Sequence, residues 1–321
     1  MNYYLNKNVL VPGGAGFIGS HLVPRLLDMG AHVTVLDNFH TGCKSNLKSV
    51  VSHPHLKIMH HDIVQPISID TDIVFNLACP ASPVHYQSDP IKTLKTSVIG
   101  TNNLLDLCHS TGARLVHAST SEVYGDPRQH PQKESYWGNV NPIGIRSCYD
   151  EGKRAAETLA MDFYRLHNID VRISRIFNTY GPNMALNDGR VVSNFVIQAL
   201  TGQNITVYGD GSASRSFCYA SDMVDALILL GARERAAGSV VNLGNPIEFT
   251  VLELANKIVS MTKSKSKIVF KPLPQDDPTM RRPDISRAIE LLDWVPKVEL
   301  EHGLLETIGY FSSMAAKERI I

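Results

Sequence analysis

The feature that most constrains the fold is a glycine-rich turn between a short apolar run and a helical pattern near the N-terminus. Residues 8–12 form a strand-like run, NVLVP, and the stretch GGAGFIGSH follows directly. Gly13, Gly16 and Gly19 are spaced three apart and open the helical pattern. Small residues there let the backbone approach a pyrophosphate, while the helix N-terminus offers free N–H groups and a positive dipole end. The turn therefore predicts a dinucleotide-binding βαβ unit.

Strand-like and helical patterns then alternate through the first half of the chain. The strand-like runs cover residues 8–12, 32–36, 56–60, 72–76, 114–118 and 170–174. Amphipathic stretches such as FIGSHLVPRLLDMG and TSVIGTNNLLDLCHSTG lie between several of them. This alternation predicts an α/β fold with a Rossmann-type, doubly wound parallel sheet. We expect residues 1–175 to form this dinucleotide-binding domain, and residues 176–321 to form mainly a smaller C-terminal lobe with interleaved segments.

Composition narrows the classes of partner and compartment. The chain has 321 residues, of which 43% are hydrophobic, and its 31 basic and 31 acidic residues leave no net charge. We therefore expect neither nucleic acid nor a membrane as a partner. The five cysteines contain no C-x-x-C pair, so neither a disulfide framework nor a metal site is expected. The N-terminus lacks the shape of a signal peptide, and the sequence predicts a cytoplasmic protein.

An acidic residue follows the second strand-like run at the position that a dinucleotide site requires. Asp37 ends HVTVLD, eighteen residues after Gly19. A carboxylate there binds the adenosine ribose hydroxyls and repels a 2′-phosphate, which indicates NAD rather than NADP. Asp62, in HHDI, follows the third run and is a candidate for binding the adenine amino group. The alternative is a plain βα turn with surface acids.

A tyrosine and a lysine are candidates for acid–base chemistry. Tyr149 and Lys153 are four residues apart in the helical stretch SCYDEGKRAAETLAMDFYRL, so they share one helix face. A phenol has a pKa near 10, and a neighbouring ammonium and a positive nicotinamide ring would both lower it. Thr120, at a predicted strand end, could bind the same alcohol oxygen. The alternative is a solvent-facing helical pair.

Together these motifs resemble the extended short-chain dehydrogenase/reductase family and, within it, the UDP-glucuronate decarboxylases, also called UDP-xylose synthases. The resemblance covers nearly the whole chain. Its longest stretches are ACPASPVHY and NPIGIRSCYDEGKR, and others are DNFHTG, STSEVYGDP, RIFNTYGP, NDGRVVSNFV, TVYGDGSASRSF and DDPTMRRPDIS.

The resemblance implies a carboxy-lyase with tightly bound NAD. The C4 hydroxyl of UDP-glucuronate is oxidised, the resulting β-keto acid loses CO2, and the ketone is reduced again to give UDP-xylose. Thr120 and Tyr149 would serve the oxidation and reduction, while Ser121 and Glu122 would orient the sugar and relay a proton to C5. Related 4,6-dehydratases carry Asp–Glu at these two positions, and the 4-epimerases usually lack the carboxylate.

The family pattern also implies a wider set of contacts. The catalytic residues are Tyr149, Lys153, Thr120, Ser121, Glu122 and Arg281. The cofactor residues are Gly13, Gly16, Phe17, Ile18, Asp37, Asn38, Phe39, Thr41, Gly42, Asp62, Ile63, Leu77, Ala78, Thr96, Tyr149 and Lys153. The residues for the nucleotide sugar, which the C-terminal lobe mainly binds, are Pro83, Tyr86, Lys95, Asn178, Arg190, Tyr208, Arg215 and Arg281. The resemblance further implies a homodimer formed through the helices near residues 95–109 and 147–167.

Four positions depart from the family pattern. Pro12 replaces a usual Thr, Cys43 a usual Arg, Ser97 a usual Asn and Asn183 a usual Arg. None removes a catalytic group, but together they leave the cofactor affinity open. Three alternatives also stay open: release of the 4-keto pentose, 4-epimerisation of a UDP-uronate, and an inactive NAD-binding regulator. The complete set of Thr120, Tyr149 and Lys153 argues against the last.

Overall fold

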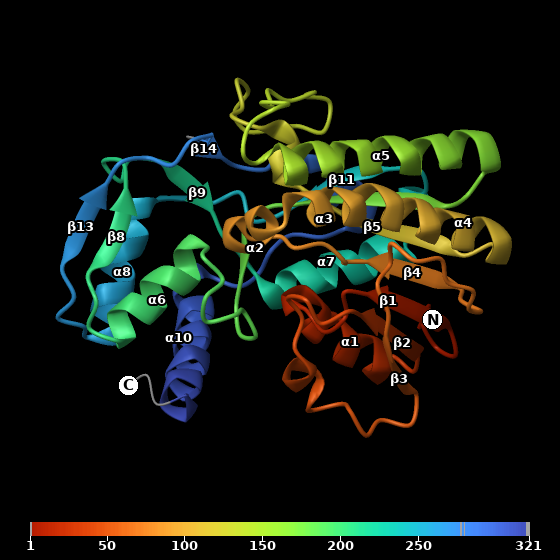
Figure 1. Cartoon of the computed structure of the whole chain (residues 1–321), viewed down its shortest axis with the longest axis horizontal. Helices are drawn as coiled ribbons and strands as arrows, with labels where there is room; N and C mark the ends of the chain where they lie inside the picture. Colours follow the sequence, from red (N-terminus) through yellow and green to blue (C-terminus); the bar gives the residue numbers. More distant parts are fainter. Residues whose placement is uncertain (1, 277, 279, 319–321) are drawn as a thin grey trace.

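The central element is a parallel sheet of seven strands. The computed structural model describes residues 2–276, 278 and 280–318. In the sheet the strands follow the order β11-β6-β5-β4-β1-β2-β3 (Figure 1). Their bounds are β1 (Asn8–Pro12), β2 (His32–Asp37), β3 (Leu56–His60), β4 (Ile73–Asn76), β5 (Arg114–Thr120), β6 (Val171–Ile176) and β11 (Val240–Leu243). All neighbouring pairs are parallel, which confirms the predicted doubly wound α/β fold.

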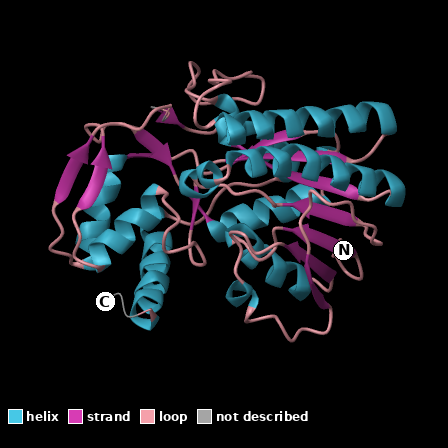
Figure 2. Cartoon of the chain, in the orientation of Figure 1, coloured by secondary structure: helices cyan, strands magenta, loops and turns pink. Residues whose placement is uncertain are grey.

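Helices cover both faces of this sheet (Figure 2). One core contains α1 (Phe17–Asp28) and α7 (Ala220–Ala232), and the other contains α4 (Thr101–Thr111) and α5 (Ser147–His167). Strand β1 sends Val9 and Val11 into the first core and Leu10 into the second. Side chains of a strand alternate between faces, so a strand buried on both sides is apolar throughout, as NVLVP is.

The second lobe has a core of its own. It consists of α6 (Val191–Leu200), α8 (Val251–Thr262) and α10 (Leu300–Lys317), which pack Val196, Ile258 and Phe311 together. Strand β8 (Ile205–Tyr208) pairs with β13 (Ile268–Lys271). A further three-stranded sheet joins β12 (Glu248–Thr250), β9 (Ser214–Ser216) and β14 (Met280–Arg281).

The chain crosses between the two lobes repeatedly. After β7 (Thr179–Tyr180), α6, β8 and β9, it returns through β10 (Cys218–Tyr219) and α7 to β11, which pairs with β6. Later α9 (Ser286–Leu292) packs against α7 and β11, before α10 joins the second lobe. The first core accordingly includes Ala288 and Trp294 from near the C-terminus.

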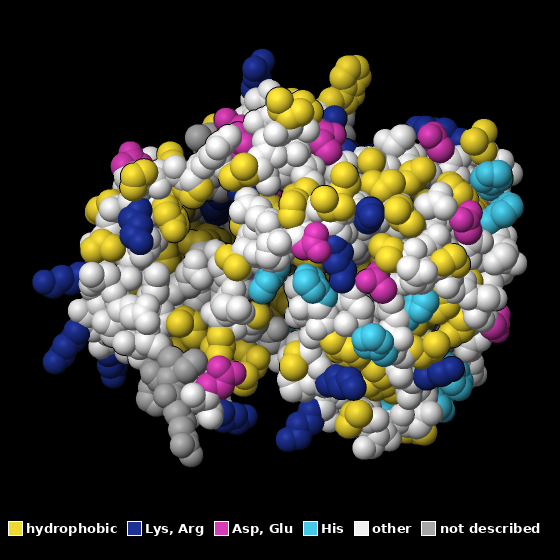
Figure 3. All heavy atoms as spheres, in the orientation of Figure 1, with side chains coloured by type: hydrophobic (Ala, Val, Ile, Leu, Met, Phe, Trp, Pro, Cys, Tyr) yellow, Lys and Arg dark blue, Asp and Glu magenta, His cyan; other side chains and the backbone are white. Residues whose placement is uncertain are grey.

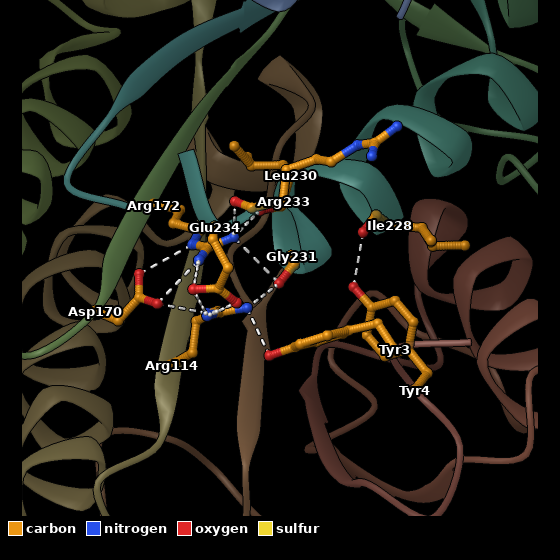
Figure 4. Close-up of polar contacts among 10 residues, drawn as sticks. All are labelled: Tyr3, Tyr4, Arg114, Asp170, Arg172, Ile228, Leu230, Gly231, Arg233 and Glu234. Carbon is orange, nitrogen blue, oxygen red and sulfur yellow. Dashed lines mark hydrogen bonds and ion pairs between the residues drawn. The ribbon is translucent and has the colours of Figure 1, made fainter. Parts of the chain in front are cut away.

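Two buried arginines hold α7 against the sheet (Figure 4). They lie at the amino ends of β5 and β6, whereas the glycine-rich turn follows the carboxyl end of β1. Arg172 is fully buried and donates to the carbonyl oxygens of Leu230 and Arg233, each at 2.7 Å. Arg114 donates to the Gly231 carbonyl at 2.6 Å. The last carbonyls of a helix lack intrahelical partners, and a cation there also faces the negative end of the dipole. The arrangement fixes α7 against β5 and β6.

Within the part of the chain that the structure describes, no helix has both the length and the apolar character needed to span a bilayer.

Candidate active site

A single large cleft brings most of the predicted residues together. It has a volume of about 1510 Å³ and is lined both by the carboxyl ends of the central strands and by the second lobe. Figure 3 shows the surface hollowed between the two lobes. Pockets for one small ligand have roughly 300–1,000 Å³. The cleft therefore has room for two extended ligands placed end to end.

The glycine-rich turn forms one end of the cleft. Gly13 has φ +76°, and a Cβ there would lie 2.8 Å from the backbone nitrogen of Ala78. A Cβ on Gly19 would lie 2.6 Å from the Gly13 carbonyl oxygen, so α1 can approach the turn only with glycine at this position. No side chain caps the N-terminus of α1 at Gly16. The free N–H groups and the open backbone suit the diphosphate of a dinucleotide.

Asp37 and Asp62 line the neighbouring part of the cleft. The carboxylate of Asp37 accepts from the backbone nitrogens of Ala15, at 3.0 Å, and Phe39, at 2.8 Å. Burial raises the pKa of Asp37, and these two backbone hydrogen bonds oppose the rise. Asp62 accepts from the Asn38 side chain at 2.9 Å. That these two carboxylates bind the ribose and the adenine of a dinucleotide stays a prediction.

Tyr149 and Lys153 lie on the buried face of α5, beside the end of β5. Nζ of Lys153 donates to the Ala118 carbonyl oxygen at 2.7 Å and lies 5.9 Å from the centroid of the Tyr149 ring. Burial raises the pKa of Tyr149 and the charge of Cys79 adds to this, while a hydrogen bond with Thr120 lowers it. The protein alone thus holds the phenol protonated. Lys153 is not among the main causes of this pKa, so the lowering expected from the lysine and from a positive nicotinamide ring stays a prediction.

Tyr86 of α2 (Pro83–Ser88) covers the other side of Tyr149. The two rings are stacked, with centroids 4.9 Å apart and planes 4° apart. The Tyr86 hydroxyl is buried and has no hydrogen-bond partner among the described residues. The stack fixes the orientation of Tyr149 and leaves a hydroxyl that a sugar could satisfy.

A cluster of opposite charges follows Thr120. In η3 (Ser121–Tyr124), the carboxylate of Glu122 lies 2.7 Å from Nη1 of Arg281 and 2.8 Å from Nη2 of Arg146. Arg281 also donates to the Ser121 hydroxyl at 3.0 Å. Burial would raise the pKa of Glu122, but the two guanidinium groups outweigh it and hold the pKa at about 2. The two arginines therefore favour the ionised form of Glu122, and the proton relay that the family resemblance implies stays a prediction.

Asp150 is a residue that sequence reasoning missed. It follows Tyr149, is 6% exposed, and its Oδ1 atom has no hydrogen-bond partner within the described residues. Burial and the charge of Glu122 raise the pKa of Asp150 to about 8, although Arg146 and Arg281 oppose the rise. The motif YDEGK contains this residue, but only the fold shows that its side chain points inward beside Glu122.

Most of the other predicted residues also line the cleft. On the cofactor side these are Phe17, Ile18, Asn38, Thr41, Gly42, Ile63, Leu77, Ala78 and Thr96, and on the sugar side Pro83, Asn178, Arg190, Tyr208 and Arg215. Phe39 and Lys95 are not part of the lining, and Lys95 is exposed. Lys92 lines the cleft instead, 3.7 Å from the Asp62 carboxylate. Cys79 and Arg146 are further lining residues that the sequence did not single out.

The departures from the family pattern have local partners. The Ser97 hydroxyl lies 3.2 Å from the Cys79 sulfur, and the Asn183 side chain donates to Ser20 at 3.1 Å. The carbonyl of Pro12 still accepts from the Leu77 backbone nitrogen at 2.9 Å, so its missing N–H does not break this strand connection. Cys43 is exposed and lines the cofactor end.

Comparison with known proteins shows the family to which the chain belongs. The profile of the NAD dependent epimerase/dehydratase family matches residues 9–244. The chain is 57% identical over 296 residues to UDP-glucuronic acid decarboxylase 4 of Arabidopsis thaliana, covering 92% of this chain and 66% of that protein, just under two thirds of its length. It is 54% identical over 306 residues to UDP-glucuronic acid decarboxylase 1 of Danio rerio, covering 95% and 73%. Among solved structures, UDP-glucuronic acid 4-epimerase of Bacillus cereus, in complex with UDP-glucuronic acid and NAD, has a TM-score of 0.86 at 26% identity, covering 96% and 99%.

Proposed function

Because this chain belongs to the NAD dependent epimerase/dehydratase family, we propose that it is an NAD-dependent carboxy-lyase that converts UDP-glucuronate to UDP-xylose. The observation that carries the proposal is the cluster of Arg281, Arg146 and Glu122 next to Tyr149. Guanidinium groups bind carboxylates in planar, bidentate geometry, and the two in this cluster are held in place by Glu122. The decarboxylases of plants and fish that match most of the chain support the same reaction.

The cofactor end of the cleft fits NAD. The backbone at Gly13 and Gly16 would hold the diphosphate, and Asp37 would bind the ribose hydroxyls. Bound NAD supplies hydride acceptance and hydride return at C4 of the sugar. Asp37 disfavours a 2′-phosphate because the two anions would repel each other.

Tyr149 and Thr120 act on the C4 oxygen. Tyr149 takes the proton of the C4 hydroxyl as the alcohol becomes a ketone, and Thr120 donates a hydrogen bond to the same oxygen. The Ala118 carbonyl fixes Lys153 beside the phenol, and burial lowers the pKa of its ammonium group. General base catalysis of this kind contributes typically about 10²–10⁴-fold to the rate.

The 4-ketone is β to the C6 carboxylate, which makes the loss of CO2 possible. The C5–C6 bond breaks, its electron pair moves into the C4 carbonyl to form an enolate, and C5 then gains a proton. Reduction of the ketone restores the C4 alcohol, and Tyr149 returns its proton. Arg281 and Arg146, fixed by Glu122, orient the carboxylate, while Ser121 is held beside them by Arg281.

Assembly and location are further parts of the proposal. A homodimer through the helices near residues 95–109 and 147–167 is supported by exposed apolar side chains on α3 (Pro90–Lys95), η2 (Thr96–Gly100) and α5: Ile91, Leu94, Ile99, Tyr164 and Leu166. A reducing compartment such as the cytoplasm is supported by five free cysteines, of which Cys43 is exposed.

Product analysis tests the reaction. The protein is incubated with NAD+ and UDP-glucuronate, and the products are identified by mass spectrometry and proton NMR. We expect UDP-xylose and one CO2 per turnover. A UDP-4-keto pentose would restrict the function to the first two steps, while the C4 epimer of UDP-glucuronate would replace the proposal with an epimerase. Absence of any conversion with NAD bound would contradict an enzymatic role.

A further inference from the structure

A buried ion pair lies behind the cleft and contributes no atom to its lining. Nη2 of Arg175, in β6, lies 2.7 Å from Oε2 of Glu157, in α5, and Nε lies 3.0 Å from Oε1. The two side chains are 13% and 11% exposed. A buried ion pair of this kind is costly to desolvate and gives little net stability. Its position relative to the catalytic residues suggests another role.

One branch of contacts leads from Glu157 to the alcohol-oxidising residues. Oε1 of Glu157 accepts from the Ser119 hydroxyl at 2.5 Å. Ser119 is flanked by Ala118, which accepts from Lys153, and by Thr120, which contacts Tyr149. Residues 149, 153 and 157 are spaced four apart, so their side chains lie on one face of α5. This face packs against the last three residues of β5, Ala118, Ser119 and Thr120. Ser119 itself lines the cleft, whereas Glu157 lies behind it.

The other branch leads from Arg175 to the charged cluster. Nη1 of Arg175 donates to the Tyr124 hydroxyl at 3.0 Å, and this hydroxyl donates to Oδ1 of Asn242 at 2.7 Å. Tyr124 ends η3, the short helix that carries Ser121 and Glu122. The branch therefore begins at the segment that holds the carboxylate-binding residues.

The second branch continues to the strand of Arg281. Asn242, in β11, donates from Nδ2 to the Gln132 carbonyl at 3.0 Å. The Gln132 side chain accepts from the backbone nitrogen of Arg282 at 2.8 Å, next to Arg281. Gln132 is fully buried, as are Tyr124 and Asn242. Buried hydrogen bonds with all partners satisfied favour one arrangement of the groups they join.

We propose that this network positions two parts of the site relative to each other: Tyr149 and Thr120, which act on the C4 oxygen, and the carboxylate-binding cluster of Arg281, Arg146 and Glu122. The positioning residues, here called the Arg175 network, are Ser119, Glu157, Arg175, Tyr124, Asn242 and Gln132. The inference rests on the proposed function, because only a reaction at both C4 and C6 of one sugar requires both sets in register. Displacement by about 1 Å can lower a rate about a hundredfold. The network joins α5, β5, β6, η3 and β11 to β14 across both lobes, so it can hold such a register.

Two substitutions, each of which removes one hydroxyl oxygen, test the two branches separately and leave the Arg175–Glu157 ion pair in place. Ser119→Ala removes the hydroxyl that holds the end of β5, and Tyr124→Phe removes the hydroxyl that leads to the charged cluster. Under single-turnover conditions with bound NAD+, the appearance of NADH absorbance reports oxidation at C4. Its disappearance reports the later steps, and released CO2 is measured in parallel.

We expect Ser119→Ala to slow the appearance of NADH by about tenfold or more, with little accumulation of NADH. We expect Tyr124→Phe to leave its appearance near the wild-type rate and to slow its disappearance and CO2 release to a similar degree, so that NADH accumulates. Glu157→Gln should slow both phases. Matched controls are Tyr136→Phe, whose hydroxyl accepts from the Arg128 backbone, and Ser110→Ala on α4; both should match the wild type.

The outcomes separate positioning from simple destabilisation. If both branch variants slow the two phases by one common factor, or if neither changes either phase, the proposal is overturned, whatever their melting temperatures. The proposed function is judged on the wild type alone, by its CO2 and its product. If the wild type instead yields the C4 epimer without CO2, the proposed function fails and the positioning role fails with it. If the wild type yields UDP-xylose and the two phases respond alike in the variants, only the positioning role fails.

Discussion

At the scale of single residues, burial is the main cause of the raised pKa of the Tyr149 phenol. Tyr149 is 5% exposed, and its pKa is raised because a buried phenolate loses hydration. Tyr149→Phe removes the group that we propose takes the C4 proton and keeps the ring that stacks on Tyr86. Turnover of UDP-glucuronate should fall at least about a hundredfold. Steady-state rates, together with NAD+ titration by melting temperature, check this; near-normal turnover in a folded variant would remove Tyr149 from the role of base.

Asp150 gives a prediction about stability and pH. Burial and Glu122 raise its pKa from 3.8 to about 8 in the folded protein, so the fold binds a proton that the unfolded chain releases between these values. The free energy of unfolding should therefore fall as the pH rises through this window, and Asp150→Asn should remove that dependence. Between pH 5 and pH 8 the wild type should lose more than about 1 kcal/mol relative to the variant.

Urea denaturation of both proteins at these pH values measures the difference. Parallel curves of stability against pH for the wild type and for Asp150→Asn would show that Asp150 does not bind the proton. Asp162→Asn, further along α5, is the matched control, because Asp162 pairs with Arg165 at an exposed position.

Motif chemistry predicted which residues gather in the cleft but not their charge states. Tyr149, Lys153, Thr120 and Glu122 could be placed because their spacing along a helix or at a strand end determines their side. The two guanidinium groups that fix Glu122 come from different segments, so its ionised state could not be read from STSEVYG. The prediction that Lys95 lies near the sugar was wrong for a related reason. Lys92 and Lys95 both belong to the short helix α3, and only the path of the chain decides which of them faces the cleft.

At the scale of elements, two helical glycines provide a matched test of close packing. A Cβ on Gly19, in α1, would lie 2.6 Å from the backbone of Gly13 and Gly14, whereas nothing lies within 4 Å of a Cβ on Gly309, in α10. Gly19→Ala should push α1 away from the turn and weaken NAD+ binding by about tenfold or more, since atoms of the phosphate cradle move by a comparable amount. Gly309→Ala should raise the free energy of unfolding by up to about 1 kcal/mol.

Isothermal titration with NAD+ and thermal unfolding of both variants check this pair. If Gly19→Ala binds NAD+ as the wild type does, the turn is not the diphosphate site. The strands of the main sheet other than β11 could be predicted because they are short, apolar and regularly spaced. Strand β11 and the two-residue strands could not, because their partners lie far away in the sequence and short runs carry no period.

At the scale of the whole molecule, the proposed homodimer predicts a measurable mass. Leu94 is 42% exposed on α3 and is one of the exposed apolar side chains on the helices of the proposed interface. Leu94→Glu would bury a charge in that interface and should shift the protein from dimer to monomer. Light scattering coupled to size-exclusion chromatography measures the mass. Leu305→Glu, at a position that is 60% exposed on α10, is the control and should stay dimeric; a wild-type monomer would contradict the proposal.

Because the chain crosses repeatedly between the lobes, the protein cannot be split into two fragments that each contain a complete core. Trp294 and Ala288 complete a core that begins with Tyr4 and Val9, and β11 closes one edge of a sheet built mainly from the first half. A gene cut near residue 176 would therefore encode two fragments, each exposing part of the other's interior. We expect neither fragment to fold alone, while co-expression of both should restore the complete protein by complementation.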